Sequence, residues 1–525
     1  MSNDNDIRLM PKAVQDFEEL RHGGYVYVDK TDMVWKIANG EKYNFLSRPR
    51  RFGKSLLVST LHYYFDGRDD LFQGLKIMDM EKEWPKRQVF HFDFSGCECA
   101  DDLSSYLNFT LAKYEEEYGR EAAAKTNKDR FLSLIQRGND KYGKPVAVLV
   151  DEYDTPLQHT LYDKDEHEEV CDIYRSFFPA LKTGGKYVKC LFITGITKFT
   201  QLSLFSTLNN ISIIGSWPEY STVCGITREE MTSNFRPELE RMEEKNEWNL
   251  ETTLDELCKM YDGYHFAAAS MGVYNPYSVI NALSRSEITN YWISSGATSM
   301  VSEMLQHVNV SAEDMEQCVI DKDALEMNDV SLDQPELFLY QAGYLTIKDF
   351  DGDFYTLGIP NNEVRTSFFK MVLPNAVGKM EYEVNSSIKN IKSALKVGDV
   401  EGAMDYLQQL VSETPYAKKG DKEREDRYRF IVKNALFLCG CQMEEEKQMA
   451  TGQIDLVAHF RNIIMVMELK LDNNKGIGGA EKQLMDRNYV SAFSAEKKEV
   501  YAIAISFACG GDRSGISSKS VKRIK

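Results

Sequence analysis

The segment around Gly53-Lys54-Ser55 constrains the fold of this chain more than any other feature of the sequence. Lys42–Leu46 has the composition of a short strand, and Leu56–Phe65 has that of a helix. A strand, a loop and a Gly-Lys-Ser sequence that opens a helix form an arrangement in which proteins surround phosphate groups. The sequence therefore predicts an α/β unit with a phosphate-binding loop near its beginning.

The residues of this loop have separate expected tasks. Gly53 permits close approach of the backbone to phosphate, Lys54 reaches the β- and γ-phosphates, and the Ser55 hydroxyl ligates Mg²⁺. The backbone around the phosphates would come from Arg48, Pro49, Arg50, Arg51 and Phe52. Arg48 stands where the common G-x-x-x-x-G-K-[ST] pattern has its first glycine, and a Gly-Lys-Ser tripeptide alone is equally compatible with an ordinary loop.

A second segment favours nucleotide binding over an ordinary loop. Val146–Val150 is a continuous apolar run, typical of a strand buried on both faces, and Asp151 and Glu152 follow it directly. Because α/β folds bind ligands at the carboxyl ends of parallel strands, we expect Asp151 to hold Mg²⁺ and Glu152 to polarise the attacking water. An acidic turn explains this segment alone, but its pairing with the upstream loop favours a nucleotide site.

Strand-like and helical stretches alternate through Met1–Arg236. The strand-like runs are Lys42–Leu46, Arg87–Phe94, Val146–Val150 and Lys189–Thr194, and Leu103–Lys128 is one of the helical stretches. This alternation is typical of an α/β fold with a mostly parallel sheet. The last strand is expected beside the acidic one, where Thr194, Thr197 and Lys198 are candidates for contact with a γ-phosphate. An ordinary turn is the commoner explanation for each of these residues.

At 525 residues the chain is too long for one hydrophobic core, and three regions differ in texture. Met1–Arg236 is predicted to form a P-loop domain. Pro237–Lys379 is predicted to form a helical middle domain of lid or winged-helix type, interrupted by a short β-like piece at Tyr344–Leu357. Met380–Lys525 is predicted to form a third domain, with helices first, then strands and a helix near Ala480–Phe493.

Several short motifs resemble those of the bacterial AAA-ATPase-like family. They are Tyr27–Thr31, Arg48–Ser55, Val150–Asp154 and Phe205–Asn210, and in the middle region Tyr261–Phe266, Tyr274–Pro276, Tyr291–Trp292 and Leu357–Asn361. Members of that family also carry arginine at the position of Arg48, so the resemblance accounts for the missing glycine. It implies ATP as the nucleotide, with Mg²⁺, and an ATPase activity. Taken by themselves, the aromatic residues of the middle region are best explained by packing.

The C-terminal region contains a predicted β-hairpin with charged residues on an apolar strand. Its strand-like runs Gln453–Phe460 and Ile463–Leu471 are joined by the polar pair Arg461-Asn462. Glu468 and Lys470 are two residues apart and therefore share one face of the second strand. Because buried charges without partners are costly, something at that face must compensate them.

Asp455 on the first strand is a second carboxylate that can converge with Glu468. Two like charges at close range require a cation, and oxygen ligands favour Mg²⁺ or Mn²⁺. The alternative is an ordinary Glu–Lys pair on a half-exposed strand. The apolar residues that flank Glu468 and Lys470 favour a metal site formed by Asp455 and Glu468.

The Asp455…Glu468-x-Lys470 pattern across a hairpin resembles the core of the PD-(D/E)XK nuclease superfamily, over about Glu423–Phe507. The resemblance implies a restriction-endonuclease-like α/β fold in which the two carboxylates hold Mg²⁺ and Lys470 positions or activates water. It also implies phosphodiester hydrolysis of DNA or RNA.

Further residues extend this resemblance. Glu425 best matches the glutamate that the superfamily often carries on the preceding helix, with Glu423 as the alternative. Gln483 and Tyr489 resemble its helical glutamine/tyrosine motif, with a longer gap between them. Two other functions stay open: a nucleotide-dependent switch or scaffold whose C-terminal domain binds nucleic acid without cleaving it, and a nuclease whose P-loop binds nucleotide without turnover.

Net charge and composition limit the classes of binding partner and the cellular location that the sequence predicts. The net charge of −18 argues against a general polyanion-coating protein, although a local basic channel can coexist with an acidic exterior. The cysteines form no disulfide or zinc pattern, the N-terminus has no secretory signal, and no apolar run is long enough for a bilayer. We therefore predict a cytoplasmic protein with reduced thiols, no membrane partner, and the possibility of a homo-oligomer that completes the ATPase site with an arginine from a neighbouring subunit.

Overall fold

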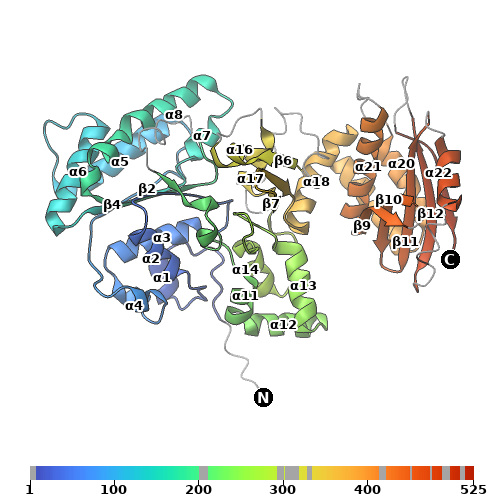
Figure 1. The fold of residues 1–525 in the computed structure, drawn as a ribbon, viewed down its shortest axis with the longest axis horizontal. Helices are drawn as coiled ribbons and strands as arrows, with labels where there is room; N and C mark the ends of the chain where they lie inside the picture. Colours follow the sequence, from blue (N-terminus) through green and yellow to red (C-terminus); the bar gives the residue numbers. More distant parts are fainter. Residues whose placement is uncertain are drawn as a thin grey trace, which may run out of the picture. The chain divides into compact units, whose positions relative to one another are not determined.

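The computed structural model describes residues 8–199, 211–292, 301, 318–327, 334–412, 421–449, 452–472, 476–486, 493, 497–508 and 515–525. The chain divides into two compact units, with the sequence boundary between Val364 and Arg365 (Figure 1). Among the described helices, none is both long and apolar enough to cross a membrane.

A five-stranded parallel sheet forms the centre of the N-terminal region. Its strands are β1 (Tyr43–Ser47), β2 (Val89–Asp93), β3 (Val146–Asp151), β4 (Val188–Gly195) and β5 (Ser212–Ile213), in the order β2-β3-β4-β1-β5. All four neighbouring pairs are parallel, which confirms the predicted sheet type. β4 lies between β1 and β3, so the carboxyl ends of these three strands reach the same edge.

Helices cover both faces of this sheet (Figure 1). On one face lie α5 (Ala100–Tyr118), α6 (Asn127–Tyr142) and α8 (Lys164–Phe177), and on the other α1 (Phe17–His22), α2 (Thr31–Asn39), α3 (Lys54–Phe65) and α4 (Ile77–Met80). The prediction of one helical stretch over Leu103–Lys128 is wrong at its C-terminal end. Gly119, with φ of +80°, ends α5, and the Thr126 side chain caps α6 by accepting a hydrogen bond from the Asp129 N–H.

The middle region combines helices with a small antiparallel sheet. Its helices include α11 (Arg228–Asn234), α12 (Arg236–Asn246), α13 (Leu250–Tyr261), α14 (Pro276–Arg285), α16 (Lys322–Met327) and α17 (Pro335–Ala342). Strands β6 (Cys318–Asp321), β7 (Thr346–Phe350) and β8 (Phe354–Gly358) pair in the order β6-β8-β7. The structure places this region, up to Val364, in the same compact unit as the parallel sheet, whereas Arg365–Lys379 belongs to the other unit. The division into three domains stays a prediction.

The second unit contains a mixed five-stranded sheet. Its strands β9 (Gln442–Met449), β10 (Gly452–Phe460), β11 (Ile463–Leu471), β12 (Glu499–Phe507) and β13 (Ile516–Arg523) follow the order β13-β12-β11-β10-β9. β10 and β11 form the predicted antiparallel hairpin, while β11 and β12 are parallel. Its helices include α19 (Glu381–Lys396), α20 (Val400–Val411), α21 (Asp421–Leu438) and α22 (Gly476–Asp486).

Helix α22 begins earlier than the predicted helix near Ala480–Phe493. Ile477, Ala480 and Leu484 are spaced to form one apolar stripe, and this stripe packs into the core beneath β11 and β12. The partly buried Ile477 packs against this core, and the helix accordingly begins at Gly476.

Glu363 in α18 (Asn362–Val377) is a buried carboxyl group of the first unit. One of its carboxylate oxygens, Oε1, accepts hydrogen bonds from the backbone N–H groups of Tyr291 (2.7 Å) and Trp292 (3.0 Å). Burial raises the pKa of Glu363 from 4.5 to about 7, against the opposing effect of Ser278 and these N–H groups. Ionisation of Glu363 therefore works against folding at neutral pH.

We expect the Glu363→Gln variant to remove part of the pH dependence of stability. Between pH 4.5 and about 7 the folded protein holds a proton that the unfolded chain releases, so wild-type stability falls as the pH rises through this window. At about pH 8 the variant should be more stable than the wild type by at most about 3 kcal/mol, and the difference should shrink toward about pH 5. Urea unfolding across this range, with the exposed Glu251→Gln as control, measures the difference; parallel pH profiles would contradict it.

Candidate functional site

The P-loop (Arg48–Ser55) joins the end of β1 to the start of α3. Gly53 adopts φ of +93°, a backbone conformation that favours glycine, and directly precedes the helix. Lys54 is the first helical residue, and its Nζ atom donates hydrogen bonds to the carbonyl oxygens of Arg48 (3.0 Å) and Pro49 (3.2 Å). The lysine is therefore held inside the loop by the carbonyl groups of the loop itself.

The loop and the acidic strand meet, as their pairing predicts. Helix α3 packs against β3, and Ser55 and Lys54 at its start lie close enough to Asp151, at the end of β3, to influence the pKa of that carboxyl group. Burial raises the pKa of Asp151 to about 6, and Ser55 and Lys54 limit this rise. A carboxyl, a hydroxyl and an ammonium group thus lie near one another at the edge of the sheet.

Glu152 adopts a strained backbone conformation next to this point. Its φ of +47° lies in the left-handed region, which a residue with a side chain seldom adopts. Its N–H donates to Asp151 Oδ1 (3.0 Å), and the Thr155 hydroxyl donates to Glu152 Oε2 (3.4 Å). The turn therefore directs the Glu152 side chain toward the cavity described next, which it helps to line.

A cavity of about 430 Å³ lies against the P-loop. Besides Lys54, Ser55 and Glu152, its walls include the N-terminal segment Pro11–Gln15 and the side of α14 formed by Pro276, Tyr277 and Ile280. The Arg51 guanidinium lies 5.1 Å from the centre of the Tyr277 ring. The volume of this cavity is in the range of sites that bind small molecules.

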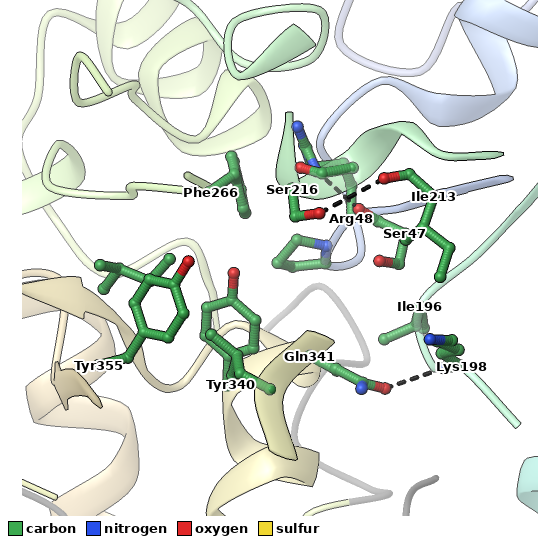
Figure 2. A pocket seen from close by; sticks show the side chains of 14 residues that line it. Ser47, Arg48, Ile196, Lys198, Ile213, Ser216, Phe266, Tyr340, Gln341 and Tyr355 are labelled. Carbon is green, nitrogen blue, oxygen red and sulfur yellow. Dashed lines mark hydrogen bonds between the residues drawn. The ribbon is translucent and has the colours of Figure 1, made fainter. Parts of the chain in front are cut away.

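The Arg48 side chain is buried among neighbouring segments, close to Ser47 and Ser216 (Figure 2). Its guanidinium donates hydrogen bonds to the carbonyl oxygens of Ser47 (2.9 Å), Gly215 (2.8 Å) and Tyr220 (3.0 Å), and lies 4.0 Å from the centre of the Phe266 ring. Burial lowers the pKa of Arg48 to about 10. Arg48 thus anchors the loop to neighbouring segments, and only its backbone can surround a phosphate.

Aromatic residues of the middle region hold the other end of the loop. The Phe52 ring packs edge-on against Tyr264, with 4.8 Å between ring centres, and against Phe266 at 5.4 Å. Both partners belong to the Tyr261–Phe266 motif, for which the sequence alone suggested only packing. Their packing partner is the P-loop itself.

The candidate phosphate sensors have other contacts. The Thr194 hydroxyl donates to the carbonyl oxygen of Leu46 (2.8 Å), which ties β4 to β1. The Thr197 hydroxyl donates to Asp154 Oδ2 (2.6 Å). Lys198 is buried, and its backbone N–H donates to Gln341 Oε1 (2.9 Å). Phe205–Asn210 lies outside the described residues.

In the second unit, three carboxylates gather around one lysine. Lys470 Nζ lies 3.1 Å from Glu468 Oε1, 3.4 Å from Asp455 Oδ2 and 3.7 Å from Glu425 Oε1. The Leu469 N–H also donates to Asp455 Oδ2 (2.9 Å), which fixes that carboxylate across the hairpin. The structure therefore brings together four residues that are spread over 46 positions of the sequence, from 425 to 470.

Burial and the nearby charges both change the pKa values of the groups in this cluster. Glu468 is fully buried. Burial alone would lower the pKa of Lys470, but the charges of Asp455, Glu468 and Glu425 outweigh it and raise the pKa. Burial also raises the pKa of Glu425, and Lys470 opposes that rise. The ammonium group thus balances the carboxylates that surround it.

The carboxylates of this cluster offer oxygen atoms, but in the described part of the chain they surround Lys470 and do not form a metal site of three ligands. Oxygen atoms of carboxylates are the ligands that Mg²⁺ and Mn²⁺ prefer. Within the part of the chain that the structure describes, no group of three or more His, Cys, Asp or Glu side chains is arranged to hold a metal ion. Gln483 lies in α22, which packs against β11. Tyr489 and the side chain of Glu423 lie outside the part of the chain that the structure describes.

Comparison with known proteins supports the first of these two sites. Residues 11–205 match a family model described as a predicted AAA-ATPase. This part of the chain is therefore similar to predicted AAA-ATPases. A protein of Azotobacter chroococcum mcd 1, named as an uncharacterized protein in the vnfD 5' region, is 29% identical over 516 residues, which cover 95% of this chain and 96% of that protein.

The matched range contains most, but not all, of the residues that line the 430 Å³ cavity. The matched residues include the P-loop, Asp151, Glu152 and the segment Pro11–Gln15. Tyr277 lies beyond the matched range and was missed by sequence reasoning, because the Asn-Pro pair before it only signals the start of a helix. Asp455, Glu468 and Lys470 also lie outside the match.

Proposed function

We propose that this protein binds ATP at the P-loop and hydrolyses it, and that its C-terminal unit cleaves phosphodiester bonds in DNA or RNA. The approach of Ser55 and Lys54 to Asp151 carries the first half of the proposal, because it brings together the two motifs that phosphate chemistry requires. The match of residues 11–205 to the predicted AAA-ATPases supports it.

The residues around the cavity suggest a division of work in ATP hydrolysis. The Lys54 ammonium and the N-terminal N–H groups of α3 would bind the β- and γ-phosphates. Tyr277 and Ile280 offer an apolar wall for the base. Glu152 would accept a proton from the attacking water. The oxygen of this water bonds to the γ-phosphorus, while the bond between the γ-phosphorus and the oxygen that leaves with ADP breaks.

The convergence of Glu425, Asp455, Glu468 and Lys470 supports the nuclease half of the proposal. Asp455 and Glu468 would hold a divalent ion, as Ser55 and Asp151 would in the first site. When bound, Mg²⁺ supplies positive charge beside the reacting phosphate and lowers the pKa of water. Lys470 would orient water and offset the negative charge that grows on the phosphate oxygens.

The Glu152→Gln variant tests the ATPase directly. We expect phosphate release to fall at least about 100-fold, because the amide cannot accept the proton of water, while ATP affinity stays within about 3-fold of the wild type. Phosphate release is measured by a coupled assay and affinity by calorimetry. Wild-type protein that binds ATP without releasing phosphate would favour a nucleotide-binding function without turnover.

A cleavage screen tests the nuclease. Single- and double-stranded DNA and RNA are incubated with the full chain, with and without Mg²⁺, and with ATP, ADP or no nucleotide. Cleavage that requires Mg²⁺ and responds to ATP is the expected result. Binding of nucleic acid with no cleavage under any condition would favour the switch or scaffold function instead.

A further inference from the structure

Asp154 fastens the loop that follows β4 to the end of β3. This loop, Ile196–Phe199, is buried throughout, and Asp154 is itself 1% exposed. Asp154 Oδ2 accepts hydrogen bonds from the N–H groups of Ile196 (2.9 Å) and Thr197 (2.6 Å), and from the Thr197 hydroxyl. A charged acceptor with several donors makes this a strong connection.

Tyr153 forms a second connection between the same two segments. Its hydroxyl donates to the carbonyl oxygen of Thr197 (3.0 Å) and accepts from the Phe199 N–H (3.0 Å). Its own N–H donates to the carbonyl oxygen of Thr194 (3.2 Å). Since Tyr153 directly follows Glu152, a shift of Ile196–Phe199 would move the candidate base through these bonds.

Gln341 of α17 holds the opposite side of this loop. Its Oε1 atom accepts a hydrogen bond from the N–H of Lys198 (2.9 Å), drawn as a dashed line in Figure 2. The same helix also reaches the P-loop, because Gly343 at its end packs so closely against Pro49 that no side chain would fit there. Helix α17 therefore contacts both the loop that follows β4 and the P-loop.

We propose that Gln341 is a positioning residue for ATP hydrolysis, which acts by fixing Ile196–Phe199 and, through Asp154 and Tyr153, the orientation of Glu152. This inference rests on the ATPase function proposed above. Gln341 is absent from the lining of the 430 Å³ cavity, as are Ile196–Phe199. Its loss should therefore alter the rate of the chemical step more than the binding of ATP.

The test compares three variants of the full chain. Gln341→Leu keeps the shape but removes the acceptor, Gln341→Glu keeps an oxygen acceptor, and Gln334→Leu makes the same change at the exposed start of α17, where the side chain forms no cap. We expect kcat to fall about 10-fold or more in Gln341→Leu with KM within about 3-fold, recovery to within about 3-fold of wild-type kcat in Gln341→Glu, and no change in Gln334→Leu.

Other outcomes overturn the proposal in distinguishable ways. Wild-type kcat in Gln341→Leu would show that the contact is not needed. Equal loss in Gln341→Leu and Gln341→Glu, with a lowered melting temperature and a changed KM, would assign Gln341 a structural role only. If the wild type binds ATP but releases no phosphate, the proposed ATPase function fails together with this inference.

Discussion

Replacement of Lys54 by alanine is expected to weaken ATP binding at least about 100-fold. The Lys54 ammonium is held inside the P-loop by the carbonyl oxygens of Arg48 and Pro49, at the start of α3. It is thus poised to exchange these neutral partners for charged phosphate oxygens, and alanine offers neither charge nor donor. Calorimetric titration with a non-hydrolysable ATP analogue measures the change in Kd.

A matched variant separates this effect from a general loss of positive charge. Lys113→Ala removes an exposed ammonium on α5 and should bind ATP as the wild type does. Thermal unfolding of both variants checks that the fold survives. If Lys54→Ala binds ATP with unchanged affinity while remaining folded, nucleotide does not bind at the P-loop.

The Lys470→Met variant is expected to lose Mg²⁺-dependent cleavage at least about 100-fold and to become less stable without metal. Methionine fills a similar volume but leaves Glu468, which is fully buried, beside Asp455 and Glu425 without the ammonium group that balances them. Loss of one partner of a buried ion pair typically costs about 3–5 kcal/mol. Added Mg²⁺ should restore part of the lost stability, because these carboxylates favour a hard cation.

Stability and cleavage are measured on the same preparations. Chemical unfolding in EDTA and in Mg²⁺ reports the stability of the C-terminal unit, and the exposed Lys396→Met on α19 serves as control. A Lys470→Met protein as stable as the wild type in EDTA would contradict the electrostatic account of the cluster. Retention of full cleavage would contradict the role of Lys470 in catalysis.

The two sites differ in how they compensate buried charge. At the P-loop, burial raises the pKa of Asp151 to about 6, and the nearby Lys54 only moderates this effect. In the C-terminal cluster, three carboxylates share one ammonium group, and the pKa of Lys470 is raised. Binding of a divalent cation would therefore favour ionised Asp151 in the first site and compete with Lys470 for carboxylates in the second.

Local sequence patterns predicted both candidate sites, because the residues that define each site lie in a few short segments. The apolar run Val146–Val150 and the Gly-Lys-Ser loop define strand, loop and helix independently of distant residues, and the structure joins them through Ser55 and Asp151. The hairpin of β10 and β11 was likewise predicted from its polar turn and from the spacing of two residues between side chains on one face of a strand. A helix end was missed where Gly119 interrupts an otherwise helical run.

The sequence by itself determined which segments can bind phosphate and which bring carboxylates together. These properties depend on residue type and on spacing along one strand or one loop. Only the tertiary structure decided that Arg48 turns toward Gly215 and Tyr220, that Tyr277 faces the P-loop cavity, and that Gln341 holds Lys198. These contacts join residues many positions apart. They depend on how helices and strands pack, and local periodicity carries no information about that packing.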